Sequence, residues 1–185
     1  MRSFATPGHR ALRIGRISEP ERSYFVTTST FGREPLFRHF EPACAMACVL
    51  FDPRSWGDAK LQAWVLMPDH LHVLVALGAM WLSEVVRRAK GRSAFEFNRS
   101  TGRRGEVWAR AFHDRAIRGE GNLQEAARYL VRNPLRAGLV EALGAYPFWG
   151  SVWTGPDGPL QERLEPRRIA CRSGFSRDRS NGVRG

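Results

Sequence analysis

The sequence predicts an α+β fold with a ferredoxin-like antiparallel sheet, in the element order β-α-β-β-α-β, followed by additional C-terminal helices. Three observations support this class. Short runs of β-branched and aromatic residues are typical of strands, apolar residues recur at helical spacing between them, and a Pro-Asp turn joins two of the runs directly. With 185 residues and 43% hydrophobic content, the chain is long and apolar enough to bury one sizeable core.

The first half of this order comes from four segments. Residues 24–30 are β-branched and aromatic and predict the first strand. Residues 36–51 carry apolar side chains near helical spacing and predict the first helix. Residues 61–67 and 70–77 are apolar runs on either side of Pro68-Asp69, and they predict a hairpin of the second and third strands.

The second half is predicted in the same way. Residues 82–98 form the second helix, with apolar residues on one side and basic residues largely on the other. Apolar and polar residues alternate over much of residues 107–118, and this pattern predicts a fourth strand. Residues 123–132 form a third helix with Asn122 as its N-cap; Pro134 breaks or kinks it, and residues 135–143 continue as a further helix. Residues 146–149 form a compact aromatic closure.

These segments define the predicted domain organisation. We expect one domain over residues 23–153, preceded by a basic N-terminal arm over residues 1–22. Residues 154–185 are rich in Gly, Pro and Arg and poor in large apolar residues, so they predict a disordered basic tail.

The charge of the chain predicts a nucleic-acid partner. It has 29 basic residues against 18 acidic ones, a net charge of +11, and its only lysines are Lys60 and Lys90. Arginine pairs bidentately with phosphate and stacks on bases, and six Trp and eleven Phe add further stacking surfaces. A GC-rich genome would favour Arg over Lys, but it does not explain the excess of basic over acidic residues.

A membrane protein is not expected. The longest apolar stretch, residues 72–82, is far shorter than the roughly 20 residues of a membrane-spanning helix. The basic N-terminal residues are not followed by the apolar run of a signal peptide. We therefore expect a cytoplasmic location and no membrane partner.

Two histidines on one strand form the first candidate site. His70 and His72 flank Leu71, so on a strand both imidazoles leave the same face, about 6.6–6.8 Å apart along the strand. Leu71 and Val73 then point to the other face, which we expect to be a core face. Two imidazoles at this spacing can converge on one metal ion, although two histidines on a solvated face would show the same pattern.

A second candidate cluster lies in the third predicted helix. Tyr129 and Asn133 are four residues apart and share one helix face. A phenol can act as a nucleophile, and an amide oxygen can bind a metal. Taken alone, the pattern also fits an interface tyrosine and an asparagine that ends a helix before Pro134.

Together these motifs resemble a known family. Trp64-Val65-Leu66-Met67-Pro68-Asp69-His70-Leu71-His72-Val73-Leu74 resembles the His-hydrophobic-His motif of single-tyrosine HUH transposases, the superfamily with the IS200-like domain. Residues 129–140, Tyr-Leu-Val-Arg-Asn-Pro-Leu-Arg-Ala-Gly-Leu-Val, resemble the tyrosine helix of its REP-associated branch. Segments at residues 24–27, 112–118 and 146–151 resemble that branch's first strand, last strand and closing segment. Asp69 departs from the pattern, because the family more often has Asn before the first His.

The resemblance implies a metal-dependent single-stranded DNA endonuclease and strand transferase, active in DNA transposition and recombination. It implies that Tyr129 is the nucleophile and forms a 5′-phosphotyrosine, and that Mg²⁺ or Mn²⁺ is bound by His70, His72 and Asn133. Arg128, Arg132 and the metal are alternative aids to deprotonation of Tyr129. The implied location is bacterial, cytoplasmic and nucleoid-associated.

The implied partner is a single-stranded DNA hairpin of the REP palindrome type, bound by a monomer or homodimer. Basic residues of the second helix and of the loop after it are the predicted DNA contacts, although each would equally suit a solvated basic surface. They are Arg87, Arg88, Lys90, Arg92, Arg103 and Arg104. The alternative function is a non-catalytic nucleic-acid-binding module on a ferredoxin-like sheet, which would need neither the histidine pair nor Tyr129.

Overall fold

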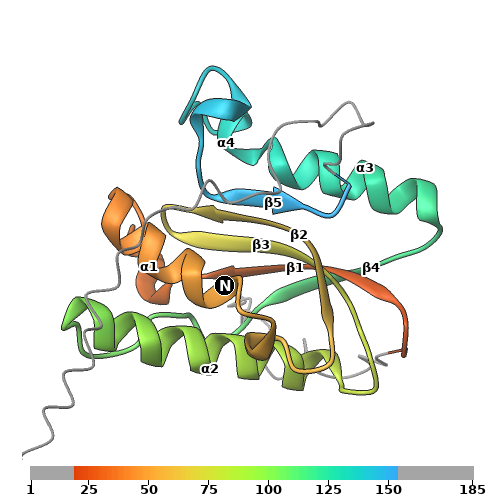
Figure 1. The fold of residues 1–185 in the computed structure, drawn as a ribbon, viewed down its shortest axis with the longest axis horizontal. Coiled ribbons are helices and arrows are strands. Elements are labelled where there is room, and N and C mark those ends of the chain that lie inside the picture. The colour runs from red at the N-terminus through yellow and green to blue at the C-terminus, as the bar shows by residue number, and fades with distance from the viewer. Residues whose placement is uncertain (1–18, 154–185) are drawn as a thin grey trace, which may run out of the picture.

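The structure is a computed structural model that describes residues 19–153 (Figure 1). The predicted tail, residues 154–185, lies outside the described residues, as does the predicted N-terminal arm up to residue 18. The domain bounds 23–153 therefore stay a prediction. No helix in the described part of the chain is both long enough and apolar enough to cross a membrane.

Five strands form one antiparallel sheet in the spatial order β4-β1-β3-β2-β5. The strands are β1 (Ser23–Ser29), β2 (Lys60–Met67), β3 (His70–Ala76), β4 (His113–Ile117) and β5 (Trp149–Ser151). The helices are α1 (Phe40–Leu50), α2 (Leu82–Thr101), α3 (Glu120–Val131) and α4 (Asn133–Arg136). The first four strands and two helices follow the order β-α-β-β-α-β, so the predicted ferredoxin-like α+β fold is confirmed.

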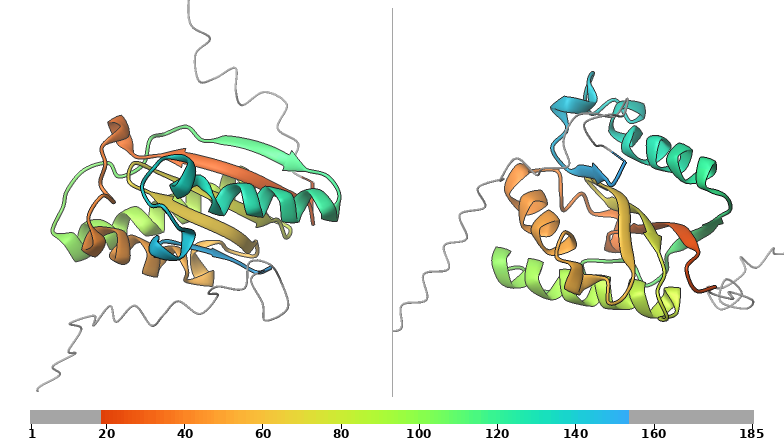
Figure 2. Two further views of the ribbon diagram at one scale, coloured as in Figure 1. Left: turned by 90° about the horizontal axis from the view of Figure 1, so that it is seen from above. Right: turned by 45° about the vertical axis from the view of Figure 1, so that its right-hand side comes forward.

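Helices cover both faces of the sheet (Figures 1 and 2). Helices α1 and α2 pack on one face, where Leu71, Val73 and Val75 of β3 join their core. Helix α3 crosses the other face, where Leu74 of β3 and Leu130 of α3 share a second core. Alternation along β3 therefore places His70 and His72 on the α3 face, opposite the core face predicted for Leu71 and Val73.

The turn between β2 and β3 is fixed to the chain that follows β1. The backbone N–H of Thr30 donates to the carbonyl of Asp69 at 2.8 Å, and that of Phe37 donates to the carbonyl of Pro68 at 2.9 Å. The Thr30 hydroxyl, in a buried residue, also donates to the Asp69 carbonyl. These bonds hold the start of β3, and so His70, in a defined place.

The first helix begins at Phe40, four residues later than predicted. Pro42 lies in its first turn, where a missing N–H is tolerated because that group has no partner within the helix. A helix starting at residue 36 would place Pro42 in its interior and lose a hydrogen bond there. Residues 36–39 instead make turns, and His39 is extended.

The fourth strand is shorter than the predicted 107–118. Strand β4 covers only His113–Ile117, and Trp108 makes an isolated bridge to Thr30. Val107 and Trp108 are buried in the core under α2, and the Lys90 ammonium donates to the carbonyls of residues 109–111. Because Lys90 takes these carbonyls, the segment before His113 leaves the sheet.

The helices after β4 also differ from their predicted bounds. Helix α3 begins at Glu120 instead of residue 123, and Asn122 does not cap it, because its side chain donates to the Arg118 carbonyl. Helix α4 is a single turn instead of the predicted 135–143. Gly138, with φ +66°, adopts the left-handed conformation that ends a helix, and its N–H donates to the Leu135 carbonyl.

Candidate active site

The imidazoles of His70 and His72 converge on the α3 face of the sheet. Their Nε2 atoms lie 3.1 Å apart, and their ring centroids lie 4.7 Å apart with the rings nearly perpendicular. His70 begins β3, directly after the tethered Pro68-Asp69 turn, and His72 lies two residues further along the strand. The structure therefore brings together the two side chains that the sequence predicted as a pair.

The other nitrogen of each ring has its own partner. His70 Nδ1 lies 2.5 Å from Asp69 Oδ1, and His72 Nδ1 lies 2.8 Å from Thr27 Oγ1 of the neighbouring strand β1. His70 Nδ1 donates to the Asp69 carboxylate and so leaves its Nε2 unprotonated, whereas the Thr27 hydroxyl can either donate to His72 Nδ1 or accept from it. In the tautomer that carries the His72 proton on Nδ1, both Nε2 lone pairs are available to one cation, with the rings held by their second partners.

The protonation of the site favours neutral histidine at His72. Burial, and to a smaller extent the neighbouring His70 and Arg33, lower the pKa of His72 to about 4. The pKa of Asp69 is also lowered: burial opposes this, but hydrogen bonds and charge from His70 and Arg33 outweigh it. Arg33 lies 3.3 Å from Asp69 Oδ2. A neutral imidazole beside an ionised carboxylate is the form that binds a cation.

The donor set fits a divalent cation in part. Two convergent imidazole nitrogens suit Mn²⁺ and related ions, and the remaining positions would be taken by oxygen donors. Among residues 19–153, no cluster of three or more His, Cys, Asp or Glu side chains is placed to hold a metal. The protein thus offers two nitrogen ligands here, and an amide or a substrate oxygen would have to complete the shell.

Asn133, the third predicted ligand, is engaged at the end of α3. Its Nδ2 donates to the carbonyl of Leu130 at 2.8 Å and more weakly to that of Tyr129 at 3.4 Å. These carbonyls belong to the last turn of the helix, whose acceptors lack partners within the helix. The structure places Asn133 at the end of the tyrosine helix, and its role as a ligand stays a prediction.

Tyr129 faces the histidine pair across one aromatic side chain. The Phe25 ring of β1 lies 5.6 Å from the His72 ring and 6.3 Å from the Tyr129 ring, centroid to centroid. The guanidinium of Arg136 lies 4.4 Å from the centroid of the Tyr129 ring. Tyr129 is therefore held between a phenyl ring and a cation, on the same face of the sheet as the histidines.

Tyr129 is also the most accessible tyrosine of the three in the chain. Its side chain is 51% exposed, whereas Tyr24 is 4% exposed and packs in the core under α1 and α2. The hydroxyl of Tyr146 donates to the Leu66 carbonyl at 2.6 Å, and burial raises its pKa to about 12. Of the three phenols, only that of Tyr129 is both exposed and beside the histidine pair.

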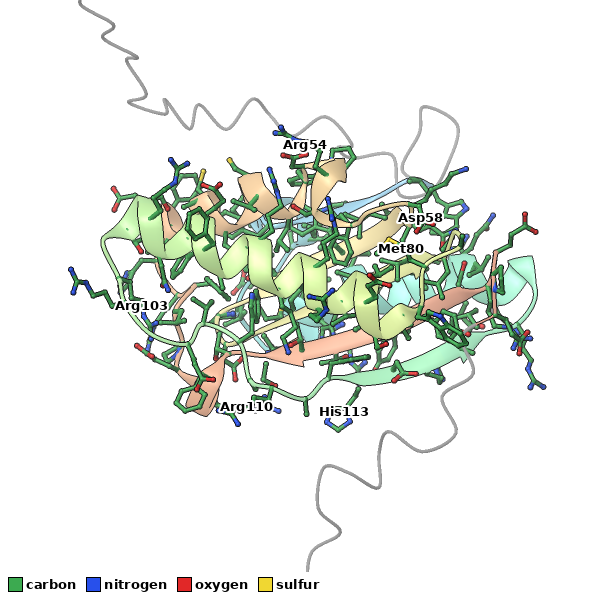
Figure 3. The ribbon with its side chains drawn as sticks, turned by 90° about the horizontal axis from the view of Figure 1, so that it is seen from below. Arg54, Asp58, Met80, Arg103, Arg110 and His113 are labelled. Carbon is green, nitrogen blue, oxygen red and sulfur yellow. The ribbon has the colours of Figure 1, made fainter. Side chains whose placement is uncertain are left out.

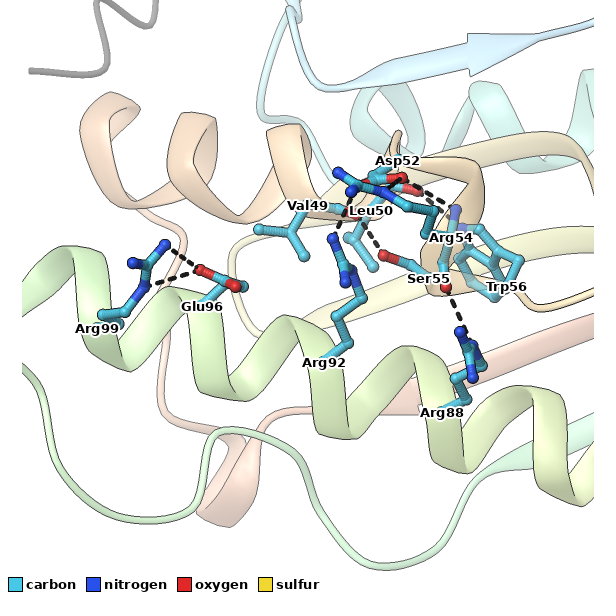
Figure 4. A network of polar contacts seen from close by, with 10 residues as sticks. All are labelled: Val49, Leu50, Asp52, Arg54, Ser55, Trp56, Arg88, Arg92, Glu96 and Arg99. Carbon is cyan, nitrogen blue, oxygen red and sulfur yellow. Dashed lines mark hydrogen bonds and ion pairs between the residues drawn. The ribbon is translucent and has the colours of Figure 1, made fainter. Parts of the chain in front are cut away.

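The predicted DNA contacts of α2 lie on the face of the sheet opposite this site. Helix α2 covers the opposite face of the sheet, as Figure 3 shows from that side. Arg92 pairs with Asp52 at 2.7 Å, Arg88 donates to the Arg54 carbonyl, and Arg54 pairs with Asp52 in the same network (Figure 4). These side chains join α2 to the turn after α1.

Three of the remaining predicted contacts also have partners within the protein. Arg87 pairs with Glu84, Arg103 pairs with Glu34, and the Lys90 ammonium is held by backbone carbonyls. Burial lowers the pKa of Lys90 to about 8. Arg104 is exposed and has no ion pair among the described residues. A DNA-binding role for the six stays a prediction.

Three residues at the site were not identified from the sequence: Thr27, Phe25 and Arg136. Alternation along the first strand is a signal for the first two, because it places Phe25 and Thr27 opposite the core residues Tyr24 and Val26. Arg136 follows Tyr129 by seven residues, or two helical turns, whereas the arginines expected to assist Tyr129 were Arg128 and Arg132.

Comparison with known proteins identifies similar sequences and folds. Residues 50–133 match the family described as "Transposase IS200 like", a range that includes both histidines and Tyr129. A protein of Haemophilus influenzae, named as a candidate REP-associated tyrosine transposase, is 27% identical over 94 residues. The alignment covers 45% of this chain and 53% of that protein, so the chain matches about half the length of this relative.

A solved structure shares the fold. A REP-associated tyrosine transposase bound to a REP hairpin superposes with a TM-score of 0.57 at 20% sequence identity. The superposition covers 80% of this chain and 82% of that one. The resemblance of the sequence motifs is thus confirmed: the chain is similar to these transposases in sequence over its central part and in fold over most of its length.

Proposed function

We propose that this protein, as a relative of the REP-associated tyrosine transposases, is a metal-dependent single-stranded DNA endonuclease and strand transferase. The nucleophile in this proposal is Tyr129, and the metal ligands are His70 and His72, with Asn133 as a third. The proposed substrate is a DNA hairpin of the REP type, because the structurally similar transposase is one bound to a REP hairpin.

One observation carries the proposal. The only exposed tyrosine, Tyr129, shares a sheet face with two imidazoles whose Nε2 atoms converge to 3.1 Å, and the Phe25 ring joins the two groups. A non-catalytic binding module on the same sheet has no need for oriented histidines beside an accessible phenol. Cleavage needs a nucleophile, which Tyr129 would supply, and a group that stabilises charge on the phosphate, which a cation held by the two imidazoles would supply.

The chemistry is a transesterification at phosphorus. The Tyr129 oxygen forms a bond to the scissile phosphorus, the bond from phosphorus to the 3′ oxygen breaks, and the leaving strand takes a proton as a free 3′-hydroxyl. The 5′ end stays on Tyr129 as a phosphotyrosine. Attack by another 3′-hydroxyl on this phosphotyrosine restores the phenol and joins two strands, so no external energy source is required.

The residues around the site have defined tasks in this reaction. Asp69 and Thr27 hold the Nδ1 atoms of His70 and His72 and thereby keep the two Nε2 atoms close together. A Mg²⁺ or Mn²⁺ ion bound there would polarise the scissile phosphate and neutralise its developing charge. Phe25 and Arg136 limit the rotation of the Tyr129 ring and keep its hydroxyl accessible.

The experiment that tests the proposal is covalent trapping. The protein is incubated with Mn²⁺ and end-labelled single-stranded hairpins, including palindromes found beside its own coding region, and the products are separated under denaturing conditions. We expect a DNA–protein adduct carrying the 5′ end and a released strand with a free 3′-hydroxyl. Hairpin binding without an adduct under Mg²⁺ and Mn²⁺ would instead support the non-catalytic binding module.

A further inference from the structure

A groove lies beside Tyr129, between the edge strand β4 and helix α3. It has a volume of about 770 Å³ and is lined by Phe25, Arg115, Arg118, Asn122, Glu125 and Tyr129, among others. Arg115 is paired with Phe25 in the register of β4 with β1, so both side chains leave the sheet on the α3 face. The candidate nucleophile therefore forms part of the wall of this groove.

The arginines of this groove have their guanidinium groups available. Within residues 19–153, neither Arg115 nor Arg118 takes part in an ion pair, and both are exposed. Asn122 donates to the Arg118 carbonyl at 2.6 Å, which fixes the backbone at the end of β4 without using the guanidinium. An exposed guanidinium without an ion pair can bind a phosphate bidentately, because no existing ion pair with a carboxylate has to be broken first.

A second groove on the other side of the molecule provides the contrast. It has a volume of about 1070 Å³ and lies between α2 and residues 105–112. Its two arginines both have acidic partners: Arg87 lies 3.8 Å from Glu84, and Arg110 lies 3.6 Å from Glu106. A phosphate entering there would meet two carboxylates as well as the arginines, and like charges oppose its binding.

We propose that the groove between β4 and α3 holds the single-stranded DNA that leads to Tyr129, with its phosphates bound by Arg115 and Arg118. The proposal rests on the proposed function, because it places the substrate of Tyr129. The Phe25 ring provides an apolar surface in the groove on which an unpaired base can stack. Glu125 is the carboxylate of the groove, and it weakens phosphate binding there.

The test compares charge-matched arginine variants. The affinity of the full chain for fluorescently labelled oligothymidylate is measured by anisotropy over a series of salt concentrations. The double variant Arg115→Gln/Arg118→Gln and the control Arg99→Gln/Arg110→Gln remove the same charge from exposed positions, and both control arginines have an acidic partner. Thermal melting of each variant verifies that it is folded.

We expect Arg115→Gln/Arg118→Gln to flatten the slope of log affinity against log salt by about 1.4, since each phosphate contact on a single strand contributes about 0.7. The control should keep the wild-type slope. Wild-type slopes in both double variants, or an equal loss in both, would overturn the proposal.

Glu125→Gln provides an independent test, in which the affinity for oligothymidylate should rise instead of fall. Removing this carboxylate should tighten oligothymidylate binding, and unchanged or weaker binding would contradict a phosphate path through the groove. This variant decides the question even where the double arginine variant fails to fold. The result of this test is distinguishable from failure of the proposed function. The salt dependence of binding reports where the DNA lies, whereas failure of the wild-type protein to form a covalent adduct would count against Tyr129 as the nucleophile.

Discussion

The Nε2 atoms of His70 and His72 lie 3.1 Å apart, while Asp69 and Thr27 occupy the Nδ1 atoms of the same rings. The two partners come from different elements: Asp69 from the hairpin turn and Thr27 from the neighbouring strand β1. Folding of the sheet thus fixes both rings before any ligand arrives. Such preorganisation reduces the ordering cost of binding a cation.

Replacing either histidine should weaken cation binding. We expect His70→Ala and His72→Ala each to lower Mn²⁺ affinity more than tenfold in a calorimetric titration, because each removes one of two protein nitrogen ligands. His39→Ala is the matched control, since His39 is an exposed histidine directly before α1 and outside the sheet. Unchanged affinity in both site variants would remove the metal assignment.

The partners of the imidazoles should matter as well. We expect Asp69→Asn and Thr27→Val to lower Mn²⁺ affinity about 10- to 100-fold, the usual cost of losing a group that orients a metal-bound histidine. Thr28→Val is a control on the same strand, because the Thr28 hydroxyl is buried on the other face of the sheet. Equal losses in Thr27→Val and Thr28→Val would indicate a general disturbance of β1 rather than orientation of His72.

Arg136 is expected to position the Tyr129 ring. A cation over an exposed aromatic ring contributes about 0.5–1 kcal/mol, so Arg136→Gln should slow single-turnover adduct formation about two- to fivefold. Arg136→Lys should restore part of the rate because a cation is kept, and Arg136→Gln should lower the melting temperature by no more than the few degrees that about 1 kcal/mol corresponds to. A purely structural role for Arg136 would instead lower the melting temperature further, without rescue of the rate by lysine.

Tyr146 tests the pH dependence of stability. Tyr146→Phe removes the hydrogen bond to the Leu66 carbonyl and should lower the free energy of unfolding by about 1 kcal/mol. The pKa of the Tyr146 phenol is raised to about 12 in the folded protein, from about 10 in the unfolded chain. The stability that the neutral, hydrogen-bonded phenol contributes is therefore complete below pH 10 and is lost as the pH rises towards 12.

Denaturant unfolding at several pH values measures this effect. Wild-type protein should lose stability between pH 10 and 12 more steeply than Tyr146→Phe does. Tyr129→Phe is the control, because its phenol is exposed and its loss should leave the free energy of unfolding unchanged. Parallel pH profiles for wild type and Tyr146→Phe would contradict a buried, hydrogen-bonded phenol at this position.

Much of the fold followed from local patterns in the sequence. Hydrophobic periodicity predicted the order of four strands and two helices, and the Pro68-Asp69 turn predicted the hairpin that presents His70 and His72. Strand alternation also predicted which face carries the histidines. These features depend on neighbours within a few residues, and the structure agrees with them.

Features that depend on distant residues were not predictable in this way. The strand expected at 107–118 is shortened because Lys90, on another element, binds the carbonyls of residues 109–111. The basic residues of α2 and of the loop after it were predicted to contact DNA, but Asp52 and Glu34 pair with Arg92 and Arg103 across 40 and 69 residues of sequence. No local pattern reveals such partners.

The most direct test of the central claim is to identify the residue that carries the DNA. After reaction of a labelled hairpin with Mn²⁺, the adduct is digested with protease and nuclease, and the modified peptide is identified by mass spectrometry. We expect a nucleotide on Tyr129, no adduct in Tyr129→Phe, and hairpin affinity in that variant within a few-fold of wild type. A modified Tyr24 or Tyr146, or an adduct that persists in Tyr129→Phe, would contradict it.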